Sequence, residues 1–452
     1  MAFRLIESLA STEQLAKLFA DESILRAMLN FEVALTKVES RLGIIPLSAA
    51  QSITSAADPA AFDVAELSRK SLHAGTPSIP LIKALTRLVQ AKDESAAAFV
   101  HWGATSQDVS DTALMLLLKQ AQPLIEADLS RCEKVLRALS EQHENSVMLG
   151  RTLLQPGPPT TFGLKAAGWL GAVRRGRERL TQAFTEALVI QFGGAVGTLA
   201  VLGEKGIAVA RGLAAELGLG CPEAPWHTHR DRLGALICAC GLLTGSLGKI
   251  ARDVSLLMQN EVAEAAEPAA EGRGGSSTMP HKRNPIGCTV TIAAATRMPG
   301  LVASYLGAMA QEHERSVGGS QSEWPTVAAV IQTTGVAAAS IAEIVEGLTI
   351  DSNRMRCNLE QTRGIVFAEK AMVLLAGELG REKTRELLET AVRKAVEQKR
   401  DFADVLADIP EITKILDKAA LEKLAAAEDY LGSAESFRRE LLRGTDSIST
   451  KS

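Results

Sequence analysis

Residues 236–261 read LICACGLLTGSLGKIARDVSLLMQNE, and their spacing of apolar side chains determines the fold that we expect. The apolar positions alternate between spacings of four and three residues, which is a heptad seam and predicts one long helix. They are Leu236, Cys240, Leu243, Leu247, Ile250, Val254 and Leu257. Three glycines, Gly241, Gly245 and Gly248, lower helix propensity in the same stretch. We therefore expect neighbouring helices to approach closely at the glycines.

Similar helical patterns extend through four other segments, roughly 112–145, 160–190, 286–313 and 324–350. Together with the seam they predict an all-α fold built on a bundle of five long helices. Such helices present more apolar surface than one bundle covers, so we expect an oligomer. The order of patterns predicts four parts, which are an N-terminal helical domain (1–110), the central bundle (111–355), a C-terminal helical domain (356–443) and a flexible tail (444–452).

Composition excludes several classes of protein. The 452 residues carry a net charge of −4 with acidic and basic residues interspersed, so we expect neither a nucleic acid nor a membrane surface as a partner. No leader-like N-terminus and no uninterrupted apolar run of about 18 residues is apparent, which predicts a cytoplasmic protein. The six cysteines are scattered, and neither the Cys238–Cys240 pair nor the His227–His229 pair has the spacing of a metal site.

Residues 272–285, GRGGSSTMPHKRNP, form the segment with the most distinctive chemistry, which we name the signature loop. Its glycines permit backbone conformations that other residues avoid, and Ser276 and Ser277 add two hydroxyls. Asn284 followed by Pro285 predicts a helix N-cap and first helical residue. Free helix amides beside Lys282 would then favour a carboxylate or phosphate ligand. A plain glycine-serine linker is the alternative interpretation, but it does not explain the MPHKRNP run.

Three further segments carry side chains suited to chemistry. Thr105 and Ser106 precede a long helix, where they either cap the helix or bind an anion. The stretch 150–156 reads GRTLLQP and includes Thr152 and Gln155. Arg315 lies in a charged segment that is either an ordinary helix end or a ligand for a carboxylate.

These segments together resemble the motifs of the fumarase/aspartase superfamily. The signature loop matches G-S-S-x-M-P-x-K-x-N, and residues 105–112 match T-S-x-D followed by D-T. Residues 314–316 read ERS where the superfamily places an E-R-x-S element. The resemblance implies a homotetramer with active sites shared between subunits, a small polycarboxylate substrate and no metal or cofactor. It assigns proton transfer to Ser276, with Lys282 as the rival donor. It implies substrate binding by Thr105, Ser106, Thr152, Gln155, Ser277, Asn284 and Arg315, and substrate-facing side chains at 75–77 and 320–322.

One departure from the superfamily pattern bears on the reaction. The second motif is usually G-R-T-H-x-Q-P, and its histidine serves proton transfer in the lyases, but this chain has Leu153 at that position. An aliphatic side chain cannot hold or move a proton. The strings at 100–108, 164–170, 225–228 and 311–316 are similar to the lactonising branch of the superfamily. An intramolecular lactonisation is therefore expected, with an adenylosuccinate lyase-like C–N lyase and a non-catalytic protein as alternatives.

Overall fold

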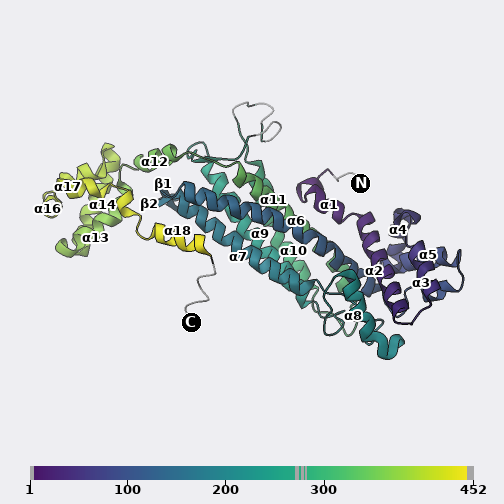
Figure 1. The fold of residues 1–452 in the computed structure, drawn as a ribbon. Coiled ribbons are helices and arrows are strands. Elements are labelled where there is room, and N and C mark those ends of the chain that lie inside the picture. Colours follow the sequence, from purple (N-terminus) through teal and green to yellow (C-terminus); the bar gives the residue numbers. More distant parts are fainter. Residues whose placement is uncertain (1–4, 270–273, 276–278, 280–281, 445–452) are drawn as a thin grey trace. The chain divides into compact units, whose positions relative to one another are not determined.

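The structure of the chain is a computed structural model that describes residues 5–269, 274–275, 279 and 282–444. Helices dominate it (Figure 1). The chain folds into two compact units, each assembled from three separate segments. Unit 1 consists of Met1–Ser130, Arg175–Lys249 and Thr289–Ile341, and unit 2 consists of Arg131–Arg174, Ile250–Cys288 and Ala342–Ser452. The predicted boundaries at 110 and 355 divide the chain by sequence order, whereas the units group segments by packing.

The five predicted long helices are all present in the structure (Figure 1). They are α6 (Ser106–Gln142), α7 (Phe162–Ala187), α9 (Asp231–Leu257), α10 (Ile286–Gly307) and α11 (Gly319–Glu346). Each of them starts in one unit and ends in the other. The predicted all-α fold class is confirmed. The largest differences in boundary are at the start of α6 and at the connection between α10 and α11, where His313 and Gly318 adopt positive φ angles that interrupt the helical pattern.

The heptad seam of α9 is the buried centre of the bundle. Its seven apolar positions are between 0% and 5% exposed. The prediction of close helix approach is confirmed at two of the three glycines of α9. A Cβ at Gly248 would lie 2.5 Å from the Ala295 Cβ of α10, and one at Gly241 would lie 3.0 Å from Val302 Cγ2. A Cβ at Gly245 would meet nothing within 4 Å in the part of the chain that the structure describes.

Shorter helices complete unit 1. They are α1 (Glu13–Leu18), α2 (Asp21–Arg41), α3 (Leu47–Ala56), α4 (Val64–Ala74), α5 (Ser78–Gln90) and α8 (Gly206–Leu217), with the 3-10 turns η1 (Glu7–Leu9), η2 (Pro59–Ala61), η3 (Ala96–Phe99) and η4 (Ala200–Lys205). The helix α2 packs against α3 and α8. These helices position the segment before α6, because the His101 Nδ1 lies 2.7 Å from the buried Glu32 carboxylate of α2.

Two short antiparallel sheets and the C-terminal helices belong to unit 2. The strands are β1 (Val147–Thr152) paired with β2 (Gln155–Thr161), and β3 (Ala265–Ala266) paired with β4 (Thr349–Ile350). The helices are α12 (Ser352–Glu360), α13 (Ala368–Leu379), α14 (Arg381–Gln398), α15 (Phe402–Ala407), α16 (Pro410–Thr413), α17 (Lys418–Leu424) and α18 (Ala434–Arg443), with η5 (Ile365–Phe367) and η6 (Glu428–Tyr430). Residues 445–452 of the predicted tail lie outside the described residues.

Within the described part of the chain, three helices have the length and mean hydropathy of a membrane span. They are α9, α10 and α11, and 61%, 28% and 67% of their most apolar windows are buried within the chain. The seam of α9 shows why α9 is apolar, since it forms the centre of the bundle. The helix α10 differs, because only 28% of its apolar window is buried within its own chain.

Glu39 of α2 gives the stability of the fold a specific pH dependence. Its side chain is completely buried, and neither carboxylate oxygen has a hydrogen-bond partner among the described residues. Burial, and then the nearby Glu32, raise the pKa of Glu39 from 4.5 to about 8. A carboxyl with a raised pKa binds more protons in the folded state than in the unfolded state. Stability from this group is therefore lost as the pH rises from 4.5 towards 8.

Replacing Glu39 should remove that dependence. Glu39→Gln keeps the volume of the side chain but cannot ionise, so we expect its free energy of unfolding to fall less than that of the wild type between about pH 5 and pH 8. Urea denaturation at several pH values measures this. Glu22→Gln, at an exposed position of the same helix, should retain the wild-type slope. Equal slopes for all three proteins would contradict the assignment.

Candidate active site

Thr105, Ser106 and Arg315 are brought together in unit 1. Arg315 Nη1 donates a hydrogen bond to Thr105 Oγ1 at 2.8 Å, and Nη2 donates to Ser106 Oγ at 3.4 Å. Thr105 and Ser106 stand at the start of α6, while Arg315 stands in the connection between α10 and α11. Two hydroxyls and one guanidinium at a helix N-terminus form a set of donors suited to a carboxylate. Three residues predicted to bind substrate therefore share one place.

The capping role at this helix belongs to Asp108 rather than to the hydroxyls. Asp108 Oδ2 accepts a hydrogen bond from the Thr105 backbone N–H at 3.0 Å, as the third residue of a capping box does. The same buried carboxylate accepts from the backbone N–H groups of Gly193 and Gly194, and its Oδ1 lies 2.7 Å from His227 Nε2. Because Asp108 accepts the hydrogen bond of the Thr105 backbone N–H, the side chains of Thr105 and Ser106 remain available to Arg315 and a ligand.

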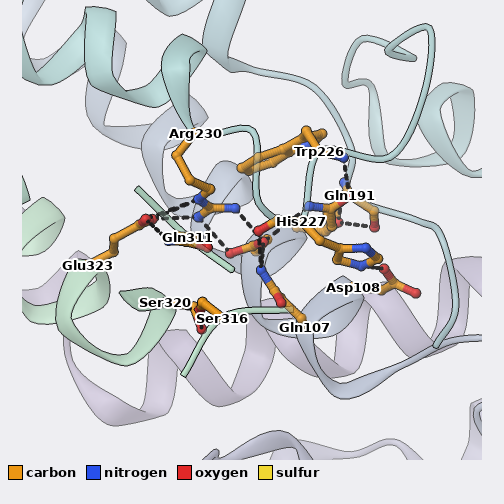
Figure 2. A network of polar contacts seen from close by, with 12 residues as sticks. Gln107, Asp108, Gln191, Trp226, His227, Arg230, Gln311, Ser316, Ser320 and Glu323 are labelled. Carbon is orange, nitrogen blue, oxygen red and sulfur yellow. Dashed lines mark hydrogen bonds and ion pairs between the residues drawn. The ribbon is translucent and has the colours of Figure 1, made fainter. Parts of the chain in front are cut away.

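A buried ion network is centred on Arg230 and is drawn in Figure 2. The guanidinium of Arg230 is 1% exposed and donates to both Asp111 of α6 and Glu323 of α11, with distances from 2.6 to 3.2 Å. Burial lowers the pKa of Arg230, but the two carboxylates outweigh burial and raise it above its ordinary value. Gln311, four residues before Arg315, donates to Glu323 at 2.7 Å. The network thus ties the start of α6 to the segment that carries Arg315.

A cavity of about 340 Å³ opens beside Arg315. It is lined by Ala74, Gly75, Thr76, Pro77, Ile79, Ser106, Gln107, Ser110, Arg315, Ser320, Gln321 and Trp324. Both segments that the superfamily resemblance placed near substrate, 75–77 and 320–322, contribute to this lining. Ser110 and Trp324 were not predicted, although Ser110 lies one helical turn after Ser106, which was a usable signal. Arg315 is the one cation among the described lining residues, so these residues give the cavity a single positive charge.

Thr152 and Gln155 lie in unit 2, at the end of the hairpin formed by β1 and β2. They are paired across the two strands, and the two residues between them, Leu153 and Leu154, form the turn. Both turn residues have positive φ angles, +50° and +62°, and their side chains are 96% and 72% exposed. Turns of this kind favour Asn-Gly, because aliphatic residues pay a steric cost at positive φ. Neither backbone preference nor solvation explains two leucines here.

A second polar network supports the hairpin. Arg151 of β1 donates two hydrogen bonds to the buried carboxylate of Glu264, at 2.9 and 2.7 Å. Asn358 of α12 donates to the same carboxylate at 2.7 Å. Arg151 belongs to the GRTLLQP motif, so the arginine of this motif holds the hairpin in place next to the residues that precede the signature loop.

The signature loop also belongs to unit 2, and its prediction needs one correction. The helix after it, α10, begins at Ile286 rather than at Pro285, and the carboxylate of Glu267 accepts hydrogen bonds from the amides of Gly287 and Cys288. Asn284 is therefore not the side-chain cap, and these two amides are not free for a ligand. Buried amides require a partner, and Glu267 supplies it from within the chain. Lys282 is exposed, Asn284 is half-buried, and Ser276 and Ser277 lie outside the described residues.

Comparison with protein families places the chain. A model described as lyase matches residues 8–300, and a model of the adenylosuccinate lyase C-terminus matches residues 364–441. The chain therefore belongs to the lyase family, and the predicted membership of the fumarase/aspartase superfamily is confirmed.

Individual relatives are similar over nearly the whole chain. The 3-carboxy-cis,cis-muconate cycloisomerase of Bradyrhizobium diazoefficiens is 47% identical over 93% of this chain and 94% of its own length. Nitrosuccinate lyase of Streptomyces davaonensis is 41% identical over 94% of this chain and 92% of its own length. The crystal structure of 3-carboxy-cis,cis-muconate lactonizing enzyme from Pseudomonas putida superposes with a TM-score of 0.91 at 41% identity, and covers 99% of this chain and 100% of that one.

The hairpin turn offers a test of whether its leucines serve function rather than folding. Replacing both, with Leu153→Asn and Leu154→Gly, relieves the positive-φ strain and should raise the free energy of unfolding by roughly 1–2 kcal/mol. If the exposed leucines contact substrate or a second subunit, the same change should lower kcat/KM. Urea denaturation measures the free energy of unfolding, and turnover of 3-carboxy-cis,cis-muconate, the substrate named for the relatives that are cycloisomerases, measures kcat/KM.

Val373→Asn, at a 74% exposed position of α13, is the control and should change neither quantity strongly. A hairpin variant with raised stability and full activity would show that the two leucines have no functional contact.

Proposed function

We propose that the chain is a 3-carboxy-cis,cis-muconate cycloisomerase, which converts its substrate to a carboxymuconolactone in the catabolism of protocatechuate through the beta-ketoadipate pathway. One observation carries the choice against the lyases that need a general acid: Leu153 stands where they have their proton-transferring histidine. The similarity to cycloisomerases over almost the full length supports the same choice.

The reaction explains why that histidine is dispensable. A substrate carboxylate oxygen adds to a carbon of a carbon–carbon double bond, the electron pair moves towards another carboxylate, and the resulting enolate-like carbon takes up one proton. No group leaves, and the nucleophile is already ionised at neutral pH, so no base is needed to activate it. The enzyme has to stabilise the developing negative charge and deliver the proton, which are tasks for preorganised donors and cations.

The predicted site residues divide between these tasks. Thr105, Ser106 and Arg315 bind one carboxylate, and their mutual distances of 2.8 and 3.4 Å support this assignment. Ser276 is the proposed proton donor, and Lys282 either stabilises the dianion or is the donor itself. Thr152, Gln155, Ser277 and Asn284 bind the rest of the substrate. The reaction needs neither a metal nor a cofactor.

A homotetramer with shared sites fits two observations. The helix α10 is apolar, yet only 28% of its most apolar window is buried within its own chain, which favours burial against other subunits. Arg315 is also the one cation among the described residues that line the cavity, whereas the substrate has three carboxylates. We propose that Thr105, Gln155 and Ser276 of each site come from three different subunits, in a cytoplasmic protein that binds neither nucleic acid nor membrane.

Two C–N lyase reactions are the rival functions. The C-terminal match supports an adenylosuccinate lyase-like reaction, but such an enzyme needs a general acid where Leu153 stands. Nitrosuccinate lyase is the second rival because of its 41% identity. Nitrite is weakly basic and leaves without a proton from the enzyme, so Leu153 does not discriminate against this reaction.

Direct turnover measurements separate these functions. We expect the purified protein to consume 3-carboxy-cis,cis-muconate and to leave adenylosuccinate and nitrosuccinate unchanged, as followed by ultraviolet absorbance and nitrite release. Lys282→Met should lower kcat by a factor of about 100 or more, since it removes a cation that stabilises the transition state. Lys414→Met, at an exposed turn position directly after α16, is the control. Preferred turnover of either other substrate would overturn the proposal.

Mixing two inactive variants tests the shared sites. Gln155→Ala and Ser276→Ala each damage one contribution, so random mixed tetramers should contain intact sites and recover up to about a quarter of wild-type activity. Subunit exchange is verified by native mass spectrometry. If exchange is complete and activity is still absent, each site is built from a single chain.

A further inference from the structure

Glu267 joins the two ends of the segment that carries the signature loop. Glu267 directly follows β3 and is only 6% exposed. Its Oε2 accepts a hydrogen bond from the Gly287 amide at 3.0 Å, and its Oε1 accepts from the Cys288 amide at 2.7 Å. One buried carboxylate therefore closes a loop of about twenty residues onto the N-terminus of α10, where negative charge is favourable.

The entrance to this segment is firmly held. The strands β3 and β4 are paired, and the preceding residue Glu264 binds Arg151 and Asn358. Pro268, the residue after Glu267, packs closely against Gly347. A Cβ added at Gly347 would lie 2.4 Å from the Pro268 Cβ. Glu267 thus extends from a fixed part of the backbone, which lets its carboxylate determine where α10 begins.

A second connection lies nearer the reactive residues. The backbone N–H of Asn284 donates a hydrogen bond to the Gly274 carbonyl oxygen at 2.9 Å, and Gly275 forms an antiparallel β-bridge with Arg283. Gly274 has a φ of +70°, and a Cβ at this position would come within 2.5 Å of the Asn284 carbonyl oxygen. Lys282 and Asn284 therefore stand on a short stretch of chain between this connection and the Glu267-bound start of α10.

We propose that Glu267 is a positioning residue for the reaction, which acts by holding the first turn of α10 and thereby Lys282 and Asn284. Ordinary helix caps such as Asp417, which accepts from the Ala420 amide of α17, stabilise one helix end. Glu267 instead links two chain ends whose separation determines where Lys282 stands. Its effect on activity rests on the proposed function, but its effect on the backbone does not.

The test compares Glu267→Gln with the matched cap variant Asp417→Asn. Glutamine keeps the volume and one acceptor, but places an NH2 group opposite a backbone N–H. We expect backbone hydrogen exchange at 282–288 in the free enzyme to be faster by about tenfold or more. We also expect kcat to fall by about tenfold or more, with KM changed less than about threefold, because Thr105, Ser106 and Arg315 are unaffected. Asp417→Asn should alter neither measurement.

A double variant separates positioning from general stability. If Glu267 acts through Lys282, adding Glu267→Gln to Lys282→Met should lower kcat little further, whereas independent effects would multiply. Unchanged hydrogen exchange at 282–288 would overturn the proposal. It would also be overturned if the losses of kcat multiply in the double variant and each loss only follows the fraction of folded protein.

If the wild type does not convert 3-carboxy-cis,cis-muconate, the proposed function fails, but the exchange measurement still decides the role of Glu267. Should Glu267→Gln not fold, Glu267→Asp carries the same comparison.

Discussion

The burial of Arg230 is the constraint on which the geometry of the unit 1 site depends. A guanidinium without solvent must have its charge balanced, and Asp111 and Glu323 do so with five hydrogen bonds. Removing either carboxylate would leave an uncompensated buried charge, so the start of α6 and the start of α11 must keep their positions around Arg230. Because Thr105 and Ser106 stand at the start of α6, and Gln311 ties the Arg315 segment to Glu323, this charge balance positions the three donors relative to one another.

Local periodicity explains how much of the fold could be predicted. All seven seam positions of α9 are buried as expected, since a heptad pattern is a property of one continuous segment. The ion network was not predicted, because Asp111, Arg230 and Glu323 are separated by about a hundred residues and nothing in their neighbourhoods indicates a partner. The Asn284 cap was wrong for the same reason: Glu267, twenty positions before Gly287, supplies the acceptor, and capping rules consider only adjacent residues.

The part of the candidate site that could be predicted consists of motif residues whose own side chains can donate hydrogen bonds. Thr105, Ser106 and Arg315 do meet, but the evidence that selected them over a capping role was resemblance. Asp108 shows what the residues alone leave open, because one side chain of the motif caps the helix and so leaves its neighbours available. Leu153 and Leu154 give a different signal, a conflict between residue type and backbone conformation that is visible only once the φ angles are known.

The division of these residues between two units has a consequence for mechanism. Unit 1 holds a set of donors fixed by buried charges, whereas unit 2 holds the hairpin and Lys282, whose supports are Glu264 and Glu267. In the proposed mechanism, recognition of a carboxylate and delivery of a proton therefore depend on separate networks with no shared residue among those described. A change in the unit 1 network should therefore alter binding, and a change in the unit 2 network should alter proton transfer. A lactonisation tolerates this separation because its nucleophile belongs to the substrate, so the enzyme has no nucleophile–base pair of its own to keep aligned.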